Sequence, residues 1–143
     1  LLYFALHGLP DQPYWYGDDF LTAMSTDAFQ DLYLRHTVVF VANCHFTESP
    51  FLPAIRARQP RAIIAGSGEN YARSQSLVGP HLLGFFLRRS LEAGLPPKLS
   101  LATARYRLQL TSSRLKSKAK KRDTRVDEDL AANLDALRFE VLS

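Results

Sequence analysis

The chain has 143 residues, of which 46% are hydrophobic and 22% charged, a balance typical of a globular domain with one sizeable core. Its net charge is a modest +4, and no apolar run approaches the roughly 20 residues that span a bilayer. Its single cysteine excludes an internal disulfide, so we expect a protein of the reducing cytoplasm with no part in a membrane.

Three short apolar runs predict β-strands, "LLYFAL" over 1–6, "TVVFVANC" over 37–44 and "RAIIAG" over 61–66. Continuous apolar runs of this kind are typical of strands buried on both faces of a parallel sheet. The first run lacks an initiator methionine and shows no signal-peptide pattern. Because three strands make a small sheet, we expect an earlier part of the protein, or a second chain, to complete the domain.

Helical patterns lie between and after these strands. The segments 51–59 and 80–94 predict helices, the second with Pro80 in its first turn and Gly94 as its stop, and another helix is expected to start near Ser100. The alternation predicts an α/β fold with a mainly parallel sheet flanked by helices. A further helix is predicted over 20–35 from apolar residues at helical spacing: Leu21, Met24, Ala28, Leu32 and Tyr33.

The predicted α/β domain covers 1–111, and 112–143 is predicted to be a basic linker followed by an amphipathic C-terminal helix. Residues 114–125 hold seven basic side chains and one acidic side chain. Such a run is usually a solvated linker or helix face, while binding of nucleic acid or an acidic partner is the alternative. The helix is expected to present one apolar face made by Leu130, Leu134, Leu137 and Val141.

Polar residues follow each predicted strand: His7 and Gly8, then Asn43 to His45, then 66–70. In open α/β sheets, ligands bind outside the carboxyl ends of the strands, so His7 and Cys44 are expected at one edge. A thiol needs a neighbouring imidazole to become an effective nucleophile at neutral pH. The backbone amides of Gly8 and Cys44 would supply an oxyanion hole.

Each of these residues also has a plain structural interpretation. A lone cysteine after an apolar strand is usually an inert core residue, and His-Gly after a strand is usually a turn. Their joint occurrence at two strand ends favours the catalytic interpretation. His45 is expected to point to the opposite face, and His36 and His81 to be structural or solvated. The histidines show no zinc-binding spacing, so no metal or cofactor is expected.

The segment "AGSGEN" after the third strand raises a serine-hydrolase alternative based on Ser67. It fails the G-x-S-x-G pattern, and it lacks the Gly-Lys-Ser/Thr ending of a phosphate-binding loop. We expect a loop lining the cleft, with Glu69, Asn70 and Arg73 as candidates for binding substrate. Glu69 would favour a basic substrate side chain beside the scissile bond, and Arg73 an acidic one.

Three motifs resemble the caspase-like cysteine peptidases, the group of caspases, metacaspases, gingipain-type proteases and CHAT domains. They are "LLYFALHG", "YWYGDDFL" over 14–21, and "VVFVANCHF" over 38–46, with His7 and Cys44 in the family's order and 37 residues apart. The resemblance covers about 1–110. It implies Cys44 as nucleophile, His7 as general base and acid, the Gly8 and Cys44 amides as oxyanion hole, and first strand–helix units that are absent here.

The chain departs from the caspase pentapeptide, because Asn43 precedes Cys44 and His45 follows it. It therefore does not resemble a true caspase, and aspartate specificity is unsupported. The leading expectation is a cysteine endopeptidase acting on a peptide or protein substrate. The alternatives are a catalytically inactive caspase-like module that works through partners and, more weakly, the Ser67 hydrolase.

Overall fold

The computed structural model describes residues 1–70, 77–118 and 124–142. The chain divides into two compact units, one formed by Leu1–Asn70 with Phe139–Ser143 and the other by Tyr71–Arg138. The predicted boundary after residue 111 lies inside a helix of the second unit, and the end of the chain belongs to the first unit. The compact units therefore have different bounds from the predicted 1–111 and 112–143.

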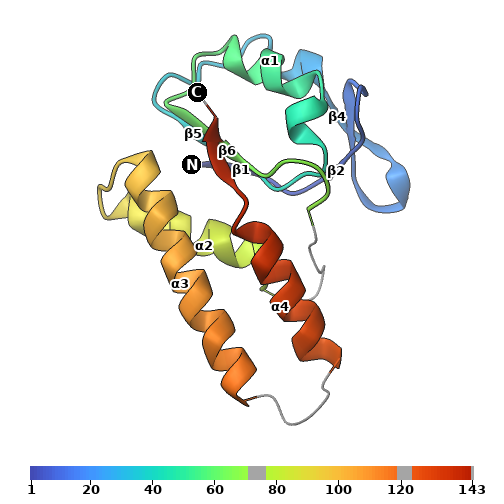
Figure 1. Cartoon of the computed structure of the whole chain (residues 1–143). Helices are drawn as coiled ribbons and strands as arrows, with labels where there is room; N and C mark the ends of the chain where they lie inside the picture. Colours follow the sequence, from blue (N-terminus) through green and yellow to red (C-terminus); the bar gives the residue numbers. More distant parts are fainter. Residues whose placement is uncertain (71–76, 119–123, 143) are drawn as a thin grey trace. The chain divides into compact units, whose positions relative to one another are not determined.

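The first unit is built on a four-stranded sheet in the order β1-β5-β6-β7 (Figure 1). β1 (Leu2–Phe4), β5 (Val38–Val41) and β6 (Ala62–Ala65) are parallel neighbours, as the apolar runs predict. β7 (Glu140–Leu142) adds to β6 in the antiparallel direction. The α/β class and the mainly parallel sheet are thus confirmed, and the fourth strand is supplied by a segment that was predicted to be helical.

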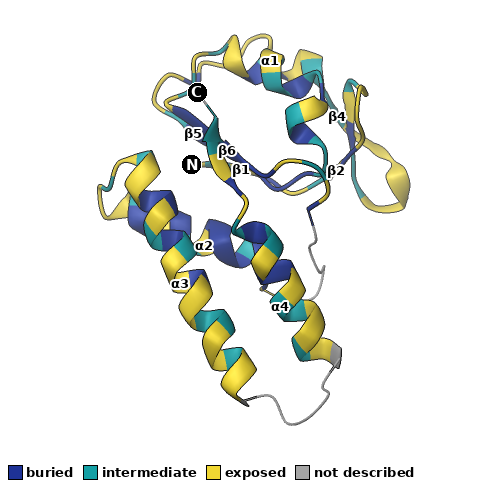
Figure 2. Ribbon diagram, in the orientation of Figure 1, coloured by how far each residue is buried: buried dark blue, intermediate teal, exposed yellow. Residues whose placement is uncertain are grey.

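Both faces of the central strands are covered, and β5 and β6 are buried along their whole length (Figure 2). On one face, side chains of the sheet pack with α1 (Phe51–Arg56), which contributes Phe51 and Ile55 to the core. On the other face the Phe40 ring lies 5.3 Å from that of Tyr3 and 5.2 Å from that of Phe139. Burial on both faces explains why these strands read as continuous apolar runs.

A second, three-stranded antiparallel sheet follows β1. It consists of β2 (His7–Gly8), β3 (Tyr14–Tyr16) and β4 (Thr22–Ser25). Its Trp15 is 1% exposed and stacks on Phe51 of α1, with ring centroids 3.9 Å apart. This contact joins the small sheet to the core of the first unit.

The helix predicted over 20–35 is wrong. The segment forms β4 and then a 3₁₀ turn over Thr26–Phe29, because β4 pairs with β3. Threonine, serine and aspartate are poor residues for a helix interior and weaken the helical alternative. The expected apolar face also does not exist, since Leu21 is 71% and Tyr33 70% exposed.

The second unit is helical and contains α2 (Gly79–Glu92), α3 (Pro97–Lys118) and α4 (Thr124–Ala136). As predicted, α2 has Pro80 in its first turn and Gly94 follows its end. Gly94 has φ of +85°, and its amide donates to the Leu91 carbonyl at 2.9 Å. α3 begins at Pro97, before the expected start near Ser100, because proline fits the first turn of a helix. No described helix is long and apolar enough to cross a membrane.

The predicted apolar face of the C-terminal helix is also wrong. α4 ends at Ala136, and its fully buried residues are Ala132, Asn133 and Ala136, whereas Leu134 is 62% exposed. Val141 lies in β7, opposite Ile64 of β6. The small alanine side chains of α4 allow close helix packing. The residues Glu140–Leu142 after the helix pair with β6 in the sheet.

We predict that Phe139→Ala lowers the free energy of unfolding by about 3–5 kcal/mol, because a large buried ring beside Phe40 is replaced by a cavity. Urea denaturation measures the change. Leu134→Ala is the control, and we expect it to stay within about 0.5 kcal/mol because that side chain is mostly exposed. Equal effects of the two substitutions would contradict the docking of the C-terminal segment on the sheet.

Candidate active site

Cys44 lies where the parallel sheet ends on the carboxyl side. β5 ends at Val41, earlier than predicted, and is followed by the buried Ala42 and Asn43. Cys44 itself is a free, half-buried thiol. The neighbouring parallel strands also end here, and the segments that follow them carry the other polar residues of the predicted site.

His7 belongs to a different sheet from the strand that leads to Cys44. It is exposed and lies in β2, opposite Tyr16 of β3. Its imidazole stacks on the Phe20 ring, with centroids 5.2 Å apart and planes at 24°. Phe20 and its neighbour Asp19 both have φ of +54°, a conformation that side-chain-bearing residues rarely adopt, so the turn presenting Phe20 carries backbone strain.

The residues on both sides of His7 contact the segment that carries Cys44. The Leu6 amide donates a hydrogen bond to Asn43 Oδ1 at 2.8 Å. Gly8 is buried, and a Cβ added to it would collide with the carbonyl oxygen of Cys44. The chain from Leu6 to Gly8 therefore crosses closely over the end of β5, and the absence of a side chain at Gly8 permits that approach.

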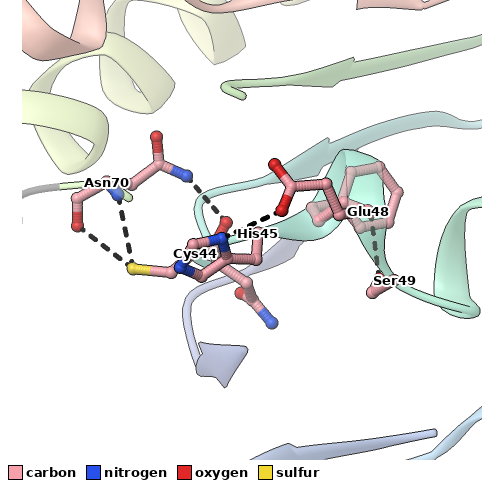
Figure 3. A network of polar contacts seen from close by, with 7 residues as sticks. Cys44, His45, Glu48, Ser49 and Asn70 are labelled. Carbon is pink, nitrogen blue, oxygen red and sulfur yellow. Dashed lines mark hydrogen bonds and ion pairs between the residues drawn. The ribbon is translucent and has the colours of Figure 1, made fainter. Parts of the chain in front are cut away.

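The thiol of Cys44 contacts both backbone groups of Asn70. The Asn70 amide donates to Sγ at 3.3 Å, and Sγ lies 3.6 Å from the Asn70 carbonyl oxygen, to which the thiol donates. The side chain of Asn70 turns back, and its Nδ2 donates to the Asn43 carbonyl at 2.7 Å (Figure 3). Asn70, which was predicted to bind substrate, is thus 9% exposed and bonded to the segment before Cys44.

His45 points away from this thiol contact. Its backbone has φ of +53°, and its amide donates to the Gly68 carbonyl at 2.6 Å. Its ring Nδ1 lies 3.3 Å from Glu48 Oε2, on the other side of the backbone from Asn70 in Figure 3. The ring thus lies away from the thiol, and a turn at His45 produces this direction in place of the expected strand alternation.

The loop after β6 contains both buried and exposed residues. Ser67 and Glu69 are open to solvent, and Gly68 has φ of +69°, which glycine adopts without strain. Glu69 stays a candidate for binding substrate. Arg73, the other charged candidate of this loop, lies outside the described residues.

The remaining histidines lie elsewhere. His36 contacts the Tyr33 ring, with centroids 6.2 Å apart, and burial lowers the pKa of His81 in α2. Over residues 1–70, 77–118 and 124–142, no group of three or more His, Cys, Asp or Glu side chains is placed to hold a metal ion.

Comparisons with protein-family models, with curated proteins and with solved structures found no match. The functional interpretation therefore depends on the residues and contacts of this chain.

Sequence reasoning found the two strand ends but missed the residue that joins them. Asn43 is fully buried, and its side chain bonds the residue before His7. A signal was present, since Asn43 falls within the strand predicted over 37–44, and a polar side chain buried at such a strand needs a hydrogen-bond partner. The identity of that partner, Leu6, is set by the crossing of the chain.

We predict that Gly8→Ala destabilises the first unit by about 1–3 kcal/mol and changes the alkylation rate of Cys44, because the new Cβ has no room beside the Cys44 carbonyl. Thermal unfolding and iodoacetamide labelling measure the two effects. Gly17→Ala is the matched control, since its Cβ would meet nothing closer than 3.9 Å and its φ is −85°. A Gly8→Ala protein as stable as this control would rule out the close crossing.

Proposed function

We propose that this chain carries the catalytic part of a caspase-like cysteine peptidase, with Cys44 as nucleophile and His7 as general base and acid. One observation carries the proposal: the residues before and after His7 both contact the segment Asn43–Cys44. These contacts support a site in which the imidazole and the thiol meet at one edge, where open α/β sheets bind ligands. Cys44 is only half-buried, which supports its proposed use as a nucleophile toward a substrate.

The proposed reaction proceeds through a thioester. His7 takes the thiol proton as the Cys44 sulfur attacks the carbonyl carbon of the peptide bond, and it returns that proton to the leaving amine when the C–N bond breaks. Water then attacks the thioester carbon and His7 accepts a proton from it. When the C–S bond breaks, His7 returns that proton to the leaving sulfur, which gives the carboxylic acid and the free thiol. The amides of Gly8 and Cys44 are the proposed donors to the negatively charged oxygen of each tetrahedral intermediate.

A non-catalytic caspase-like module is the second candidate, and one observation favours it. The thiol bonds both backbone groups of Asn70, while the His7 ring stacks on Phe20. Catalysis requires the His7 ring to leave this stack and approach Sγ, a change that substrate binding can drive, since catalytic hydrogen bonds often tighten only in the complex. In the non-catalytic alternative the stack persists, and the edge serves to bind a protein partner.

The edge strand β1 is the proposed docking position for a further part of the domain. A first strand–helix unit, supplied by an earlier part of the same protein or by a second chain, would pair with β1, which has one neighbour in the described sheet. The peptide or protein substrate would lie across the edge that carries Cys44. Residues 114–118 of the basic run form the end of α3, and 119–123 lie outside the described residues. The proposed roles of the run as a solvated linker or helix face, or as a site for nucleic acid or an acidic partner, stay predictions.

We predict that Cys44→Ala abolishes both peptide hydrolysis and labelling by an electrophilic peptide probe. Cys44 is the only cysteine, so labelling reports this residue alone. Ser67→Ala is the matched control, because Ser67 is exposed on the neighbouring loop, and we expect wild-type rates from it. Activity lost in Ser67→Ala and kept in Cys44→Ala would establish the serine alternative. Absent labelling of folded wild-type protein would favour the non-catalytic module.

We predict that His7→Gln lowers kcat for peptide hydrolysis by about 10²–10⁴-fold, the usual contribution of a positioned general base. His7 is exposed, so the variant should fold and keep its melting temperature close to that of the wild type. Steady-state kinetics on a peptide substrate give the comparison. A kcat within about threefold of the wild type would remove His7 from the mechanism.

A further inference from the structure

Asn43 carries a buried amide at the point where β1 leaves the main sheet. The last backbone hydrogen bond between the two strands runs from the Ala42 amide to the Phe4 carbonyl at 2.8 Å. Two residues further along the chain, the Leu6 amide donates to the side-chain Oδ1 of Asn43 at 2.8 Å and not to a backbone carbonyl. The Asn43 side chain therefore takes the place of a backbone acceptor where β1 and β5 separate. It joins Leu6, the residue before His7, to the residue before Cys44.

The buried amide of Asn43 has a cost. The residue is 0% exposed, and its Nδ2 has no hydrogen-bond partner within the described part of the chain. An unpartnered buried polar group destabilises a fold by about 1–3 kcal/mol. Stability alone thus does not favour asparagine here, and its benefit lies in what Oδ1 holds in place.

Asn70 completes the arrangement from the other side of Cys44. Its Nδ2 donates to the Asn43 carbonyl at 2.7 Å, while its backbone amide donates to Cys44 Sγ at 3.3 Å. A Cβ at Gly66 would collide with Asn70 Oδ1, so the glycine after β6 makes room for this side chain. The side-chain bond therefore holds the backbone of Asn70 against the sulfur of Cys44.

We propose that Asn43 and Asn70 are positioning residues that together fix Cys44 relative to His7, an inference that rests on the proposed function. Asn43 bonds to Leu6 and so connects the segment of His7 to that of Cys44. Asn70 contacts the Cys44 sulfur with its backbone and the Asn43 carbonyl with its side chain. Neither side chain touches the substrate. Both act by holding the segments that carry the nucleophile and the base at a fixed separation, from which the His7 ring can reach Sγ, and a displacement of 1 Å costs about 10²-fold in rate.

The chain offers a matched control for Asn43. Asn133 in α4 is also 0% exposed, its Oδ1 also accepts a backbone amide, that of Gly79 at 2.7 Å, and its Nδ2 is likewise unpartnered among the described residues. It belongs to the other compact unit. Asn43→Leu and Asn133→Leu therefore remove the same chemistry from two places, one beside Cys44 and one in the helical unit.

We expect both leucine variants to lose a similar amount of thermal stability, and Asn43→Leu alone to lower kcat by about 30-fold or more with KM within about threefold. Asn133→Leu should keep kcat within about threefold once the folded fraction is taken into account. Equal losses of kcat in the two variants would overturn the proposal, because both residues would then be merely structural.

A second variant covers the case in which Asn43→Leu does not fold. Asn70→Asp has nearly the same shape but places an oxygen where Nδ2 donates to the Asn43 carbonyl, while its own backbone amide remains. We expect about a tenfold lower kcat with KM within about threefold. Unchanged kcat in folded Asn70→Asp would overturn the role of Asn70.

Hydrogen exchange separates a failure of this inference from a failure of the proposed function. If the wild type hydrolyses no peptide, the peptidase assignment fails, but the Leu6 and Asn70 amides can still be followed. About tenfold faster exchange of the Leu6 amide in Asn43→Leu, with no change in Asn133→Leu, would support the joint between the two segments. Unchanged exchange of that amide would overturn it.

Discussion

The close crossing of residues 6–8 over the end of β5 is the constraint on which the candidate site depends. A strand that leaves a parallel sheet exposes amides that the ladder no longer satisfies. Here the Leu6 amide bonds to the side chain of Asn43, and two residues later Gly8 lies against the Cys44 carbonyl. A hydrogen bond and a missing side chain thus bring a residue of the small sheet beside the end of the large one.

The rest of the first unit keeps this crossing in place. Trp15 of the small sheet stacks on Phe51 of α1, and α1 packs on the face of the main sheet that carries Val39 and Val41. The small sheet therefore cannot slide without opening a dense aromatic core. In such a core, rigid packing holds neighbouring polar groups in a fixed geometry and leaves little room for substitution.

Much of this arrangement was predictable from local pattern. Buried strands are recognisable over Val38–Val41 and Ala62–Ala65 because every side chain there is apolar. Gly94 is recognisable as a helix stop because glycine readily adopts a positive φ, and in the structure its φ is +85°. The segment 20–35 was not predictable in this way, since its apolar spacing is helical by coincidence and its partner, β3, decides its structure. Val141 is similar: its place in the sheet depends on Ile64, which lies far away in sequence.

Local sequence pattern was enough to predict the buried parallel strands and the polar residues after them, among them Cys44. The tertiary structure was needed to show that His7 lies in β2 of the small sheet, against Phe20, and that Asn43 joins its segment to the one that carries Cys44. It was also needed to show that Asn70 turns inward to the thiol. The reason is physical. Apolar periodicity reports whether a residue is buried, whereas the partner of a buried polar group depends on which distant segment the chain brings beside it.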